Sequence, residues 1–204
     1  MIRDGWPPHR PPAAARGLPC ASHLVPTLSV PGNVRTLKAR EFLFTCEELA
    51  FASLPPEFPR PERRVMWTIL QFFWGDPRAH IELQPQVSRG LVELGLHFEG
   101  TVEFNDAWAA LVAARSSELA GALGDDWELE DWTATWRRLH RTWSFDRLDT
   151  GLASEVASGL AVALQTFQPL LAEGAALVPA VPPPARAPEA GGRRDWRRRP
   201  AGRR

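Results

Sequence analysis

The 204-residue chain has no tyrosine and a single lysine, Lys38, against twenty-three arginines. Lys38 follows leucine, so the chain has no Gly-Lys-Ser/Thr loop of the kind that binds nucleotide phosphates. A restriction-type nuclease core also uses a lysine, and none lies near Asp76 and Glu93. We attribute the arginine bias to a GC-rich coding sequence, so arginine-rich ends alone do not indicate a function.

Cysteine is scarce, and long apolar runs are missing. Cys20 and Cys46 are the two cysteines, and their spacing fits neither a disulfide framework nor a zinc site. No apolar run approaches the roughly eighteen residues that would span a bilayer, and the first residues lack the apolar stretch of a secretory signal. We therefore expect a soluble cytoplasmic protein with reduced thiols and no membrane partner.

The common catalytic signatures are also missing. The chain contains no Gly-x-Ser-x-Gly, His-Glu-x-x-His or Gly-x-Gly-x-x-Gly pattern. His80-Ile81-Glu82 has the spacing of the His-x-Glu motif of zinc deaminases, but no Pro-Cys-x-x-Cys follows it. These absences leave open whether the protein is an enzyme.

Proline and charge divide the chain into three parts. Residues 1–35 and 179–204 are rich in proline and arginine, and we predict that both are disordered extensions. Residues 36–178 are expected to form one domain, and residues 41–184 carry ten basic and twenty-one acidic groups, a net charge of −11. An acidic body repels a phosphate backbone. Nucleic acid is therefore expected to bind only through the basic ends, which could instead fold back onto this body, or through a local patch.

Hydrophobic periodicity indicates a mixed domain. Helices are expected at residues 36–54, at residues 101–123, and from Asp149 to about Gly174, with Pro169 bending or ending the last one. Strands are expected at residues 65–74 and 79–84, in the run that ends at Glu99, and in the first half of residues 127–143. The predicted fold class is α+β: a short antiparallel sheet, a meander of three strands plus one, with two or three helices packed on one face.

The hairpin around Pro85 contains the side chains best suited to chemistry. If its turn is centred near Val87 and Ser88, Glu82 faces Glu93 and His80 faces Gly95. Side chains alternate across a strand, so one face of this hairpin is apolar. The other face carries His80, Glu82, Glu93, His97 and Glu99.

Two imidazoles and three carboxylates on one rigid surface could bind a divalent metal such as manganese, iron or zinc, with Gly95 leaving room for a ligand. The simpler interpretation is a solvated polar face that binds no cofactor, as is common in half-buried antiparallel sheets. Glu82 directly opposite Glu93 argues against it, because like charges across a ladder repel each other. A nearby arginine, or a register shifted by two residues, would remove this conflict without a metal.

A second candidate surface lies in residues 127–143, where tryptophans alternate with basic residues. If this segment is a surface strand, it is the one aromatic and basic patch of the acidic body, and it could bind a partner. The alternative is an amphipathic element with arginine on its solvent side. The candidate binding residues are Trp132, Trp136, Arg137, Arg138 and Arg141.

Two functions follow from these patterns. The first is a small binding or accessory module that contacts another protein through its polar sheet face or its Trp/Arg segment. The second is a metal-dependent hydrolase, for example one that acts on phosphodiesters, with the His/Glu face as ligands or base.

Overall fold

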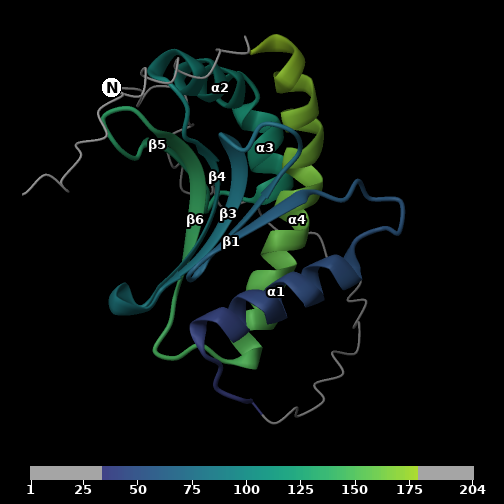
Figure 1. The fold of residues 1–204 in the computed structure, drawn as a ribbon, viewed down its shortest axis with the longest axis vertical. Coiled ribbons are helices and arrows are strands. Elements are labelled where there is room, and N and C mark those ends of the chain that lie inside the picture. Colours follow the sequence, from purple (N-terminus) through teal and green to yellow (C-terminus); the bar gives the residue numbers. More distant parts are fainter. Residues whose placement is uncertain (1–33, 179–204) are drawn as a thin grey trace, which may run out of the picture.

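A computed structural model describes residues 34–178, and the fold is α+β as expected (Figure 1). Six strands form one fully antiparallel sheet in the order β1-β2-β3-β4-β6-β5. The strands are β1 (Glu62–Met66), β2 (Ile69–Phe73), β3 (Ala79–Gln86), β4 (Leu91–Phe98), β5 (Glu128–Asp131) and β6 (Arg137–Ser144). The predicted extensions, 1–35 and 179–204, lie almost entirely outside the described residues.

Four helices cover one face of this sheet. They are α1 (Ala39–Ser53), α2 (Val102–Ala114), α3 (Ser116–Leu123) and α4 (Thr150–Leu177). α4 runs along the length of the molecule and crosses α1 (Figure 1). The core lies between the helices and the sheet, where Ile81, Leu83, Leu94 and Leu96 are fully buried.

The central hairpin joins β3 to β4 through a short 3₁₀ turn, Val87–Arg89. Gly90 ends this turn with φ +63°, a backbone conformation that glycine adopts without steric cost. The alternation predicted for this hairpin is confirmed, because its odd-numbered β3 residues and even-numbered β4 residues form the core.

Three element predictions are wrong in detail. The run 65–74 is not one strand but parts of β1 and β2, joined by a tight turn at Trp67 and Thr68. The helix predicted at 101–123 is interrupted at Arg115, which separates α2 from α3. In residues 127–143 one strand was predicted, in the first half; this strand is present as β5, but the second half forms another strand, β6.

α4 is long and apolar enough to cross a membrane by length and composition, with a mean hydropathy of 1.2 in its most apolar window. Leu160, Leu164 and Phe167 of this helix are fully buried against the rest of the fold, whereas Val162 and Leu177 are exposed. Pro169 lies inside α4 and does not end it. Such a helix is consistent with the core of a soluble protein.

Candidate metal centre

The polar face of the sheet places two histidines directly opposite each other on its two central strands. His80 of β3 pairs with His97 of β4, and Glu82 pairs with Gly95. The register predicted from the sequence, with Glu82 opposite Glu93, is therefore wrong by two residues. The correct register brings both imidazoles to one place and removes the repulsion between those two carboxylates.

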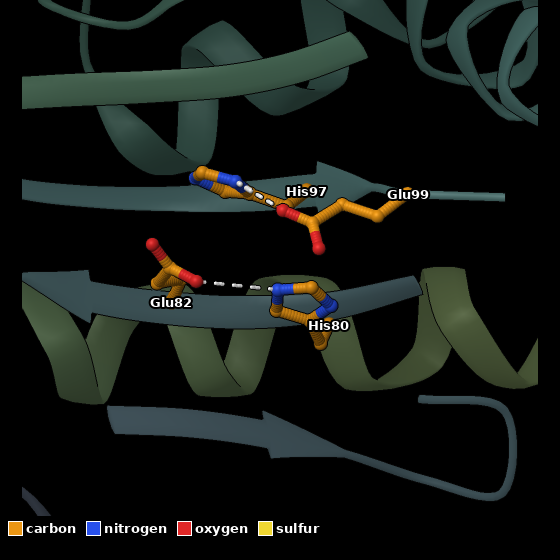
Figure 2. Close-up of side chains that lie close together, drawn as sticks. All are labelled: His80, Glu82, His97 and Glu99. Carbon is orange, nitrogen blue, oxygen red and sulfur yellow. Dashed lines mark ion pairs between the residues drawn. The ribbon is translucent and has the colours of Figure 1, made fainter. Parts of the chain in front are cut away.

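Four of the five predicted ligands converge. One ligand atom from each of His80, Glu82, His97 and Glu99 lies within 4.8 Å of the other three. Figure 2 shows the four side chains facing one another across the two strands. Each strand contributes a His-x-Glu pair, with Nε2 of His80 3.5 Å from Glu82 Oε2 and Nδ1 of His97 3.7 Å from Glu99 Oε1.

The tautomer of His80 follows from its contact with the backbone. Its Nδ1 lies 2.9 Å from the carbonyl oxygen of Pro77, which can only accept a hydrogen bond. Nδ1 therefore carries the proton, and the lone pair of Nε2 faces Glu82. Metal-binding histidines are commonly oriented in this way, with the second ring nitrogen donating to a carbonyl or a carboxylate.

His97 is buried completely, yet neither of its ring nitrogens has a hydrogen-bond partner among the described residues. Its nearest carboxylate oxygens, from Glu93 and Glu99, are 3.4 and 3.7 Å away, too far for a well-formed hydrogen bond. The imidazole stacks on that of His80 with ring centroids 5.6 Å apart, and the edge of Trp132 covers it at 5.3 Å. Buried polar atoms without partners are rare in folded proteins, and a bound ion is one explanation for them.

Glu93, the fifth predicted ligand, is not part of this group. Arg138 donates to its Oε1 at 2.6 Å and Gln86 donates to its Oε2 at 2.8 Å. Burial alone would raise the pKa of Glu93, but His97 and Arg138 outweigh burial and lower this pKa to about 2. Glu93 therefore serves as the counter-ion of a buried arginine.

The charged groups of this face also shift one another's pKa values. Burial opposes the charged form of His97, but Glu93, Glu99 and Glu82 outweigh it and raise the pKa of His97 to about 9. Burial also acts to raise the pKa of Glu82, but the charge of His97 and the hydrogen bond from Gln71 are among the interactions that outweigh it and lower that pKa. The group thus has an excess of negative charge that attracts a positive one, whether a proton or a metal ion.

The sequence suggested that Gly95 leaves room for a ligand, but this prediction is wrong. A Cβ atom at this position would lie 2.9 Å from Nε2 of His97 and 2.9 Å from Cβ of His140. The imidazole of His97 therefore packs against the backbone of Gly95, and this contact fixes the position of the ring.

The Trp/Arg segment does not form one continuous patch. Arg137 and Arg138 are both buried; Arg137 pairs with Asp106 and Asp131, and Arg138 pairs with Glu93 and Glu130. Arg141 lies over the ring of Trp143, on the helix side of the sheet. The rings of Trp132 and Trp136 contact each other in the β5–β6 connection, with centroids 5.6 Å apart and planes tilted by 34°. A partner-binding role for these residues stays a prediction.

Gln71 was not predicted as a residue of the polar face. It lies on β2 opposite Glu82 and is 3% exposed. Its amide nitrogen is 2.9 Å from His80 Nε2 and 2.8 Å from Glu82 Oε2. It lies in the run that was interpreted as a single strand covered on two faces. Placing the turn at Trp67 would have given β2 its own alternation and put Gln71 on the polar face.

Comparisons with protein-family models, with curated proteins and with solved structures give no significant match to this chain. The arrangement of the His/Glu group is therefore the basis for any function.

Proposed function

We propose that the protein is a divalent-metal-binding domain whose ion is held by His80, Glu82, His97 and Glu99. The observation that carries this proposal is His97, a fully buried imidazole beside three further ligand side chains, whose two nitrogens have no hydrogen-bond partner among the described residues and only long ion pairs of 3.4 and 3.7 Å. An ion that displaces the proton of His97 leaves both imidazoles neutral, so the four ligands then carry two negative charges. A divalent cation would neutralise them.

Zinc is the ion that this ligand set suits best. It binds imidazole nitrogen and carboxylate oxygen at about 2.0–2.2 Å, usually with four ligands in a tetrahedron. Tetrahedral ligand atoms at that distance are roughly 3.4 Å apart, so a present separation of up to 4.8 Å requires the side chains to contract around the ion. The two glutamates have the rotatable bonds to do so.

The burial of the ligands favours a structural or regulatory ion over a hydrolytic one. A catalytic ion keeps a coordination position open to water and substrate, whereas His80, Glu82 and His97 are almost fully buried and only Glu99 is partly exposed. The ligand set is the one that the sequence suggests for the alternative function, a metal-dependent hydrolase, and the binding or accessory module without a cofactor stays the other prediction. A protein partner and a cytoplasmic location stay predictions.

Calorimetric titration of the full-length, chelator-treated protein with zinc, manganese and nickel tests this proposal. We expect one equivalent of zinc to bind, and His97→Ala and His80→Ala to abolish this binding. His140→Ala is the matched control, because His140 lies on the same face one strand away but outside the ligand group. Glu93→Gln should also retain binding.

Two results would overturn the proposal. One is that none of the three ions binds to the wild-type protein. The other is that zinc binding survives in both His80→Ala and His97→Ala, which would assign it to other groups such as His9 and His23.

A further inference from the structure

We infer that Gln71 closes the metal site in the absence of an ion, so that this residue sets the metal affinity of the domain. This inference rests on the proposed function, since it concerns the same four ligands. It assigns a role to a residue that is not itself one of them.

The amide of Gln71 uses both of its hydrogens on atoms that a metal ion would need. The Gln71 amide nitrogen is a donor, since the carboxylate oxygen of Glu82 can only accept, so His80 Nε2 beside the same nitrogen accepts while its Nδ1 donates to Pro77. At 2.9 Å and 2.8 Å, the Gln71 amide nitrogen therefore donates to the lone pairs of His80 and Glu82. An ion cannot bind the single lone pair of His80 Nε2 until the amide has moved away, whereas the carboxylate of Glu82 has further lone pairs.

The orientation of this amide is fixed by the same chemistry. In the reverse orientation its oxygen would face two acceptors, His80 Nε2 and Glu82 Oε2, and would be repelled by both. In the present orientation Oε1 is buried and has no hydrogen-bond partner among the described residues. The side chain thus leaves its own oxygen unsatisfied in order to hold the two ligands.

The backbone holds Gln71 at this position. β2 pairs with β3 so that Gln71 lies directly opposite Glu82, on the polar face of the sheet. At 3% exposure the side chain has little access to water as a substitute partner. Binding of a metal must therefore displace an internal donor, and this displacement opposes binding.

Gln71→Leu tests the inference, because leucine retains most of the bulk and cannot donate. A hydrogen bond to a charged group contributes enough that its loss corresponds to about a tenfold change in an equilibrium constant. We therefore expect zinc to bind the full-length Gln71→Leu protein roughly tenfold more tightly than the wild type in calorimetric titration. Gln71→Glu, which replaces the donor with an acceptor, should also bind zinc more tightly.

Gln84→Leu is the matched control, since Gln84 lies on the same face of β3 and contacts Gln86 rather than the ligand group. Its zinc affinity should equal that of the wild type.

Structural damage at Gln71 would weaken metal binding, so a rise in affinity is not explained by a purely structural role. Unchanged or weaker binding by Gln71→Leu, with normal binding by the wild type, would overturn this inference alone. Failure of every variant and of the wild type to bind zinc would overturn the proposed function instead.

Discussion

Gly95 is the residue on which the position of the His97 ring depends. Gly95→Ala would place a methyl group 2.9 Å from His97 Nε2 and from His140 Cβ, closer than such contacts allow. Because overpacking of a buried site typically costs 1–3 kcal/mol, we expect the free energy of unfolding in urea to fall by about 2 kcal/mol. The displaced imidazole should also lose zinc binding. Wild-type zinc affinity in Gly95→Ala would show that the ring does not need this support.

Trp67 is strained and exposed at the same time. It is the one non-glycine residue between positions 34 and 178 with positive φ, +53°, and its side chain is 89% exposed. A left-handed conformation costs an L-residue about 1–2 kcal/mol, which glycine avoids. We expect Trp67→Gly to be more stable than Trp67→Ala by about 1 kcal/mol in urea unfolding, since both lack the indole but only glycine relieves the backbone. Equal stabilities would mean that the turn is not strained.

At the scale of single residues, alternation sufficed to place His80, Glu82, His97 and Glu99 on one face. It did not give the pairing, because register depends on the loop, and the loop consists of Val87–Arg89 followed by Gly90 in the left-handed region. The distance between His80 and His97 was therefore beyond a prediction from periodicity. Assigning the positive φ to Gly90 would have shifted the turn in the right direction.

The long helix α4 begins at a cap that titrates. The amides of Leu152 and Gly151 donate to Oδ1 of Asp149 at 3.0 Å, and these bonds, together with Arg147, lower the pKa of Asp149. A lowered pKa in the folded state means that Asp149 adds stability above its unfolded pKa of about 3.9. This stability is lost as the pH falls through the lower, folded value.

Asp149→Asn separates this charge from the hydrogen bonds, because asparagine also caps helices well. We expect the difference in unfolding free energy between wild type and Asp149→Asn to shrink as the pH falls from 5.5 to 3. Asp149→Ala, which removes the cap itself, should cost about 1 kcal/mol at neutral pH. A difference between wild type and Asp149→Asn that is constant with pH would contradict the assignment.

At the scale of elements, the sequence predicts the ends of those helices that have a capping residue or a proline nearby. The cap at Asp149 and the stop at Pro55 mark two helices correctly. The break between α2 and α3 falls at Arg115, which is neither glycine nor proline and is stabilised instead by its salt bridge to Glu118 and by its ion pair with Glu173. The turn at Trp67 and Thr68 has no typical turn residue. The partner Glu173 is distant in sequence and the turn has no local signal, so local patterns revealed neither feature.

In the molecule as a whole, the sheet has two differently built faces. Helices cover the apolar face, whereas the charged side chains of the other face bury one another, as Glu93, Arg138 and His97 show. The sequence predicted that this second face is polar but not that its centre is buried. Burial at this face includes the ion pair of Arg138 on β6 with Glu93 on β4, which is distant in sequence, and its ion pair with Glu130 on the adjacent strand β5.

The proposed ion would connect β3 and β4, the two central strands, so its removal should affect the whole domain. A ligand that binds only the folded state adds about 2.7 kcal/mol of stability at one hundred times its dissociation constant. We expect zinc at that concentration to raise the urea midpoint of the wild type and to leave the slope of unfolding unchanged, as for one cooperative unit. EDTA should reverse this shift, and His97→Ala should show none, whereas His140→Ala should keep it. An increase in slope without a shift in midpoint would indicate that zinc acts on the unfolded chain, because a change in slope reports a change in the surface exposed on unfolding.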